Sequence, residues 1–239
     1  DDHAYRDNDE ENMLSSGKRW LGDKMTSFSN SKSFSFNFPN LITSVPVKVV
    51  SQIGAKTSKP YGSVTTVSVN GQVLINHNDA GINPGDIYPP GSIIYKGIAN
   101  YNASGDQLNV AYNFTVSNDP TGTAACYIDY LEIFAKRALS MSGSVMAFRN
   151  ASSVGAGNIS EFQLNNASSD IRIWDITDPG NVQQMNATLN GSQLKFIAST
   201  SNLREFVAFN PSATFVTPEF VSNVENQNLH AIGEPDMVI

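Results

Sequence analysis

The chain has little charge, a single cysteine and no long hydrophobic run. Charged residues make up 15% of its 239 residues, below the roughly 25% of ordinary globular chains. No stretch approaches the ~18 consecutive apolar residues that a membrane-spanning helix needs. Residues 1–11 are acidic, which excludes a signal peptide in this segment. Low charge combined with many Asn, Ser, Thr and Val residues is typical of exported β-proteins, so we expect a soluble protein of the cell envelope or exterior.

The formal net charge of −7 is concentrated at one end of the chain. Residues 1–12 hold six acids and one arginine, a balance of −5, which leaves −2 for the other 227 residues. Because the body carries no basic stripe that could attract a phosphate backbone, we expect no nucleic-acid partner. We interpret the acidic start as a solvated tail.

Cys126 is the single cysteine, which excludes an intrachain disulfide, a zinc-finger cluster and a CxxC redox motif. It precedes an apolar strand pattern, and a free cysteine in that position is typically a small buried hydrophobe. The alternative is a nucleophile with His77 or His230 as its base. No local sequence signature supports catalysis, so we predict that Cys126 is buried.

The histidines are His3, His77 and His230, and they are far apart in the sequence. None has the HxH or HExxH spacing that brings metal ligands together. His3 lies in the acidic tail, and His77 follows a predicted strand, where we expect a solvated imidazole in a loop. The residues alone therefore assign no catalytic, cofactor-binding or metal-binding position.

Strand patterns dominate the chain. Phe34, Phe36 and Phe38 alternate with polar residues, which is the two-residue period of a half-buried strand. Asn70-Gly71 and Asn190-Gly191 each separate two apolar runs, and this dipeptide supplies the left-handed residues of a tight hairpin turn. Further strands are expected over residues 45–50, 93–98, 108–116, 127–134, 145–148, 159–164, 171–176, 182–189, 193–198 and 204–209.

Short strands separated by turn signals, without any amphipathic helix of three turns, predict an all-β fold of two consecutive β-sandwich modules. A composition shift over residues 135–143 predicts the boundary between them. We expect four segments. Residues 1–32 are an acidic tail and entry segment, in which Trp20 packs on the first module. Residues 33–137 form a jelly-roll-like sandwich, residues 138–225 a smaller Ig-like sandwich, and residues 226–239 a connector.

Two features leave a binding role open. The turn-rich loop 76–92 could hold calcium through its oxygen-bearing side chains, although any long turn has the same composition; the side chains are Asn76, Asn78, Asp79, Asn83 and Asp86. Several tyrosines could form a sugar-stacking platform, although aromatic residues in strands more often belong to the core; they are Tyr61, Tyr88, Tyr95, Tyr101 and Tyr112. Trp174 lies in a strand before an Asp-Pro turn, and we expect it to be a structural anchor.

Three groups of short motifs follow one another along the chain. They are SGKRWLGDK at 16–24 with FSFNFP at 34–39, IWDITDP at 173–179 with EFVAF at 205–209, and NQNLHAI at 226–232 leading into PDMVI at 235–239. In this order and spacing they resemble the region just ahead of the gingipain-type cysteine peptidase domain in PorU-like proteins. Those proteins are the cell-surface sortases of the type IX secretion system in Bacteroidetes.

The resemblance implies a parent chain that removes C-terminal sorting signals from secreted cargo. The family's catalytic His and Cys lie within the peptidase domain, which would begin near Pro235, so this chain is expected to have no activity of its own. Cys126 and His230 match no catalytic position. The implied location is the extracellular face of the outer membrane. The implied partners are the chain's own downstream peptidase domain, secretion components and cargo.

The leading hypothesis is therefore a non-catalytic region that braces or positions a downstream peptidase domain. The alternative is a cell-surface carbohydrate-binding or adhesion module. Neither hypothesis requires a cofactor or a metal.

Overall fold

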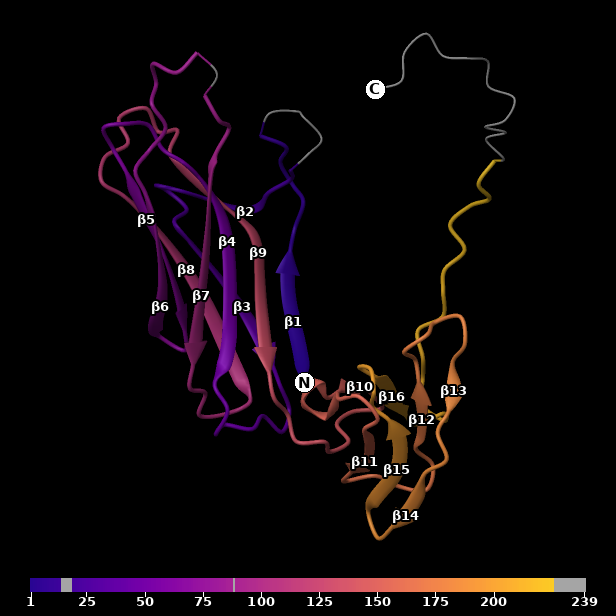
Figure 1. The fold of residues 1–239 in the computed structure, drawn as a ribbon. Helices are drawn as coiled ribbons and strands as arrows, with labels where there is room; N and C mark the ends of the chain where they lie inside the picture. Colours follow the sequence, from indigo (N-terminus) through magenta and orange to yellow (C-terminus); the bar gives the residue numbers. More distant parts are fainter. Residues whose placement is uncertain (14–18, 88, 226–239) are drawn as a thin grey trace.

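A computed structural model describes residues 1–13, 19–87 and 89–225, and these form two consecutive β-sandwiches (Figure 1). Within the described residues, the only helical element is one 3-10 turn at Ala151–Ser153. The all-β prediction is confirmed. None of the helical structure described is long and apolar enough to cross a membrane. The predicted connector 226–239 lies outside the described residues.

The first sandwich consists of two antiparallel sheets. In one sheet the order is β1-β9-β4-β7, and β2 also pairs with β9; the strands are β1 (Asp2–Asp7), β2 (Gly22–Thr26), β4 (Val47–Lys56), β7 (Ile93–Tyr101) and β9 (Ala125–Ala135). In the other sheet the order is β3-β8-β5-β6; the strands are β3 (Ser31–Asn37), β5 (Ser63–Val69), β6 (Gln72–Asp79) and β8 (Gln107–Val116).

Large side chains from both sheets fill the space between them. The bulkiest fully buried ones include Tyr112, Phe38 and Phe114. Each such side chain contributes about 1.5–3 kcal/mol of transfer free energy when it leaves water. The predicted hairpin at Asn70-Gly71 is confirmed, because β5 and β6 pair on either side of it and both turn residues have positive φ, +47° and +85°.

The predicted solvated tail is wrong for residues 2–7. These residues form β1, which pairs with the second half of β9, and β2 continues along the first half of the same strand. The inward-facing side chains of β1 include Arg6, whose guanidinium donates to both oxygens of the buried Asp23 at 2.7 and 2.9 Å. The backbone pairing with β9 and the Arg6–Asp23 ion pair stabilise this segment as a strand, although its acidic residues alone favour a solvated tail.

Two described stretches, residues 8–13 and 19–21, lie between β1 and β2. These two stretches are hydrogen-bonded to each other, because the backbone N–H groups of Glu10 and Glu11 both donate to the carbonyl of Leu21. Leu21 is fully buried, whereas Trp20 is 46% exposed. The packing of Trp20 on the first sandwich stays a prediction, and Leu21 packs in a small cluster with Ala125 and Tyr127 of β9.

The second sandwich also has two antiparallel sheets. One has the order β10-β16-β12-β13 and the other β11-β15-β14. The strands are β10 (Val145–Arg149), β11 (Ile159–Leu164), β12 (Arg172–Asp175), β13 (Gln183–Gln184), β14 (Thr188–Asn190), β15 (Gln193–Ser199) and β16 (Glu205–Phe209). Phe206 lies at the centre of the core, with the rings of Phe148, Phe162 and Phe196 within 5.4 Å of its own.

Two predictions for the second sandwich need correction. The expected strand 182–189 is divided into β13 and β14, because the chain crosses between the sheets at this point and each half pairs with a different partner. Trp174 is not a core anchor. Its neighbour Ile173 is buried, while Trp174 points outward at 40% exposure and meets the ring of Phe209 edge-on at 4.8 Å.

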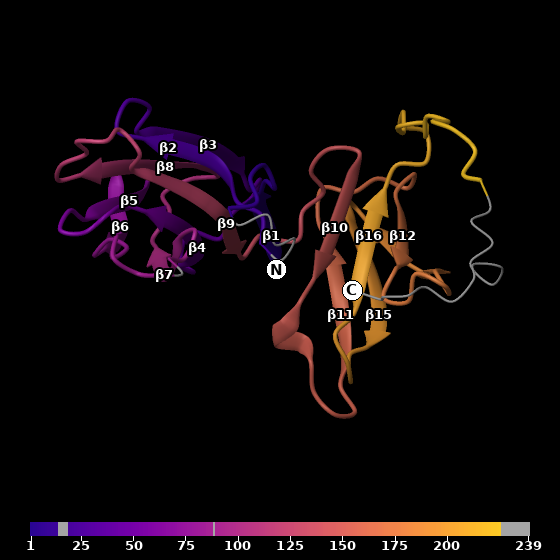
Figure 2. The same cartoon turned by 90° about the horizontal axis from the view of Figure 1, so that it is seen from above.

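The two sandwiches lie beside each other as separate lobes, and the start of β1 lies between them (Figure 2). The chain passes from β9 of the first lobe into β10 of the second. The segment after β16 leaves the second lobe and extends away from it (Figure 1).

Candidate functional site

Cys126 is fully buried in the core of the first sandwich, as predicted. Its Sγ accepts a hydrogen bond from Thr65 Oγ1 at 3.2 Å. Burial raises the pKa of the thiol to about 12. Because the thiolate is the nucleophilic form of cysteine, a thiol in this environment is unreactive at neutral pH.

We expect the native thiol of Cys126 to resist chemical labelling. At pH 7.5 a thiol with a pKa of about 12 holds over 1000-fold less thiolate than an unfolded cysteine with a pKa of ~8.5. Reaction with a disulfide reagent should therefore be at least 1000-fold slower in the native chain than in guanidinium, where complete reaction is the control. A native rate within tenfold of the denatured rate would show that the thiol is accessible.

His77 lies in a strand and not in the predicted solvated loop. It belongs to β6, is 4% exposed, and its Nε2 lies 3.0 Å from Ser51 Oγ, to which the Tyr112 hydroxyl also donates at 2.9 Å. Burial lowers the pKa of His77 to about 4. The strand continues to Asp79 because β6 pairs with β5 over its whole length. The inward alternation of Ile75, His77 and Asp79 was the sequence signal for this continuation.

Asp79 is a structural carboxylate at the end of β6. It accepts hydrogen bonds from the hydroxyls of Thr57 and Tyr95 and from the backbone N–H of Gly81. Asp86 lies in an exposed loop, where its carboxylate accepts from Asn83. Within residues 1–13, 19–87 and 89–225, no three His, Cys, Asp or Glu side chains are placed to hold a metal ion.

The predicted tyrosine platform does not form on one surface. Tyr101 and Tyr112 are buried in the core, and Tyr95 is tied to Asp79. Tyr61 is half-buried, and Tyr88 lies outside the described residues, as does His230.

Sequence reasoning missed a different group of aromatic rings, on the outer face of the five-stranded sheet. The rings belong to β1 and β9, which are neighbouring strands in this sheet. The His3 ring stacks on that of Phe134 at 4.5 Å, and Tyr5 beside it is 68% exposed. The ammonium groups of Lys48 and Lys96 lie over the rings of Phe134 and Tyr130. The sequence signal for this strand was the alternation of His3 and Tyr5 with smaller or charged residues, in the segment that we predicted to be a tail.

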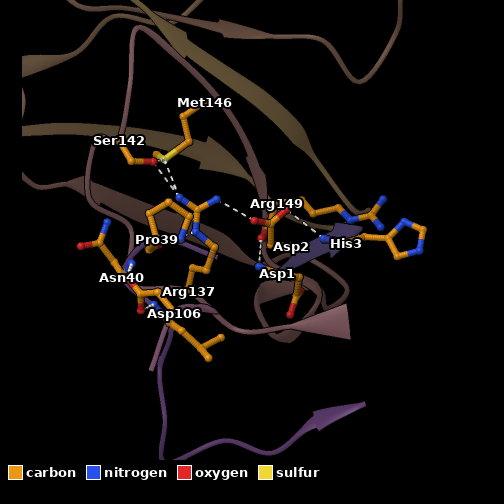
Figure 3. A network of polar contacts seen from close by, with 11 residues as sticks. Asp1, Asp2, His3, Pro39, Asn40, Asp106, Arg137, Ser142, Met146 and Arg149 are labelled. Atoms are coloured by element: carbon orange, nitrogen blue, oxygen red, sulfur yellow. Dashed lines mark hydrogen bonds and ion pairs between the residues drawn. The ribbon is translucent and has the colours of Figure 1, made fainter. Parts of the chain in front are cut away.

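A network of long-range polar contacts lies at the junction of the two sandwiches, and Arg137 is its centre (Figure 3). The Arg137 Nε donates to the carbonyl of Pro39 at 2.6 Å. Its Nη1 donates to Asp2 at 2.6 Å, and its Nη2 donates to the hydroxyl of Ser142 at 2.7 Å. One guanidinium therefore joins β1, the turn after β3 and the segment that enters the second sandwich.

The turn that accepts from Arg137 is itself held in place. The carboxylate of Asp106 accepts the backbone N–H groups of Asn40 and Leu41 at 2.9 and 3.1 Å. Asn40 has φ of +63°, a conformation that asparagine tolerates better than most residues. The carbonyl of Pro39 that accepts from Arg137 therefore lies in a turn that Asp106 already holds in place.

Asp1 makes a second set of contacts across the junction. Its backbone nitrogen donates to the carbonyl of Arg149 at 2.6 Å, and its carboxylate accepts the N–H of Ala151 at 2.7 Å. Lys136 reaches both the Asp1 carboxylate at 2.9 Å and the hydroxyl of Ser152 at 3.0 Å. Acidic residues assigned to a solvated tail therefore link the two sandwiches.

A cavity of about 320 Å³ lies at this junction. Its apolar lining comes mainly from the second sandwich, through side chains such as Met146, Phe148 and Phe162, and its polar lining includes Arg137 and Lys136. Both cations are already paired with Asp2 and Asp1. The charged groups of this junction therefore pair with one another between the two sandwiches.

No protein-family model matches the chain, and no curated protein matches its sequence. Among solved structures, the chain is similar to dimeric latent PorU from Porphyromonas gingivalis, with a TM-score of 0.74 and 18% identity over 98% of this chain. The chain spans 22% of the length of that PorU chain. The predicted resemblance to PorU-like proteins is thus confirmed at the level of fold.

Other similarities are weaker. A carbohydrate-binding module of family 36, solved with calcium and xylotriose, is 14% identical over 49% of this chain and 84% of its own, with a TM-score of 0.34. At that score the match carries no argument about this chain.

Proposed function

We propose that this chain is a non-catalytic region that positions a downstream gingipain-type cysteine peptidase domain at the cell surface. The observation that carries the proposal is the fold shared with PorU over 98% of the chain. In the proposal, the parent protein removes C-terminal sorting signals from secreted cargo, and its catalytic residues lie beyond the segment described. Secretion components and cargo are the further partners.

The internal chemistry of the chain supports a structural role. Cys126 has its thiol in the core, and His77 Nε2 lies within hydrogen-bond distance of Ser51 on the facing sheet. The contacts of Arg137 and Asp1 at the junction fix one sandwich against the other. A fixed pair of sandwiches can hold an attached domain at a set distance and angle, which two loosely linked sandwiches cannot.

The test compares the parent protein with its peptidase segment alone on two substrates. On a folded cargo protein carrying its sorting domain, we expect kcat/KM to fall at least tenfold when the sandwiches are removed. On a short peptide with the same cleavage site, we expect a change of less than twofold, because a short peptide needs no positioning. Equal loss on both substrates would point to misfolding of the peptidase, and no loss on either would contradict the proposal.

The alternative function is carbohydrate binding or adhesion, and one observation favours it. Tyr5 is 68% exposed beside the stacked ring of His3 on an open sheet face. A glycan array separates the two functions, since a positioning role predicts no sugar binding. Binding that is lost in Tyr5→Ala and kept in Tyr61→Ala would favour the adhesion module.

A further inference from the structure

The outer face of the β10-β16-β12 sheet carries a group of apolar side chains, with Arg172 in register with Phe209 at one end and the Arg149–Glu205 ion pair at the other. Antiparallel register places Val145 beside Phe209 and Trp174 beside Val207 on this face. Val145 is 48% exposed and Trp174 is 40% exposed. Large contiguous apolar surfaces on soluble proteins mark contact sites, and tryptophan is enriched among the residues that dominate binding energy.

The opposite outer face of this sandwich differs in character. Ile159 on β11 and Ile197 on β15 are 73% and 63% exposed, and the charged side chains Glu161 and Lys195 lie on the same face. Isolated apolar side chains among charges are normal on a protein surface. The aromatic rings of Trp174 and Phe209 therefore distinguish the face that carries them.

The apolar face continues into the segment that leaves the second sandwich. Phe215 packs edge-on against Phe209, with ring centroids 6.2 Å apart. Beyond it, residues 216–225 form no strand or helix, and their large apolar side chains are 76–96% exposed; these are Val216, Phe220, Val221 and Val224. Apolar side chains therefore continue from this face into residues 215–224.

We propose that this face and the exit segment 210–225 form the docking surface for the next domain of the same parent chain. The inference rests on the proposed function, in which that domain is the peptidase. A domain attached through the exit segment has a high effective concentration at this face, so a modest contact area suffices to hold it. The matched PorU chain, of which this fold spans 22%, is long enough to include such a domain.

Hydroxyl-radical footprinting of the two tryptophans tests the proposal. Trp20 on the first sandwich is 46% exposed and serves as the matched control for Trp174 at 40%. Comparing the 239-residue chain with the intact parent, we expect the oxidation rate of Trp174 to fall at least fivefold in the parent. Phe220 should be protected with it, and the rate at Trp20 should change by less than twofold.

Each other outcome is informative. A parent that contains the peptidase but leaves Trp174 as reactive as in the 239-residue chain overturns the docking surface and leaves the proposed function standing. A parent without a peptidase domain overturns both. Protection of Trp174 that appears in the 239-residue chain alone and grows with its concentration assigns the face to a second copy, and it overturns the proposal.

A variant provides an independent readout. In the parent, Trp174→Ser is expected to increase the rate at which a protease cuts the exit segment at least fivefold, because the segment loses its cover. Trp20→Ser is the matched control and should leave that rate within twofold. Equal cutting rates for the two variants contradict the proposed docking.

Discussion

Replacing Arg137 with alanine is expected to lower the free energy of unfolding by about 2–3 kcal/mol. The guanidinium is 15% exposed and bonds to a carbonyl, a carboxylate and a hydroxyl from three different segments. Its removal leaves Asp2, whose side chain is 29% exposed, without its cation. Breaking a buried charge pair costs about 3–5 kcal/mol, and the partial exposure of Asp2 reduces that figure.

Urea unfolding at pH 7 measures the effect, and Arg172→Ala is the matched control. Arg172 is exposed, and its guanidinium bonds to backbone carbonyls of its own segment, so its loss should cost less than about 0.5 kcal/mol. Arg137→Lys should recover only part of the loss, because an ammonium cannot reproduce the planar fork of the guanidinium. If Arg137→Ala were no worse than Arg172→Ala, the junction network would have no energetic role.

The second large effect is a loss of stability in mild acid that arises from His77. Burial lowers its pKa from 6.5 to about 4, so the folded chain holds this ring neutral where the unfolded chain protonates it. The contribution is fully present above pH 6.5 and is lost as pH falls toward 4. Linkage gives a loss of about 2 kcal/mol between pH 7.5 and 5, and about 3 kcal/mol by pH 4.

Urea midpoints at several pH values measure this loss, and His77→Gln removes the titrating ring. We expect the variant to show a free energy of unfolding that is about 2 kcal/mol less dependent on pH between 7.5 and 5. An unchanged slope in His77→Gln would contradict a buried neutral histidine.

The parts of the fold that follow a local pattern were predictable from the sequence. Asn70-Gly71 specifies its own turn geometry, and the alternation of Phe34, Phe36 and Phe38 specifies a half-buried strand, so both were correct. The burial of Cys126 followed from its place in an apolar strand. In each case the information lies within a few neighbouring residues.

The junction could not be predicted, because its charges are compensated across the chain. Asp1 and Asp2 look like part of a solvated tail when only their neighbours are considered. Their partners Lys136 and Arg137 lie over 130 residues away, and only the pairing of β1 with β9 brings the two pairs together. The exposed faces of Tyr5 and Trp174 depend in the same way on which side of a sheet is left open.

The central claim is that the two sandwiches form one rigid body suited to positioning an attached domain. Spin labels at Val73 and Ile197, which are 54% and 63% exposed on different sandwiches, allow a direct measurement by double electron–electron resonance after replacement of each residue with cysteine. We expect a single narrow distance distribution in the otherwise unaltered chain and a broad one once Arg137→Ala is added. A broad distribution without that substitution would contradict the account.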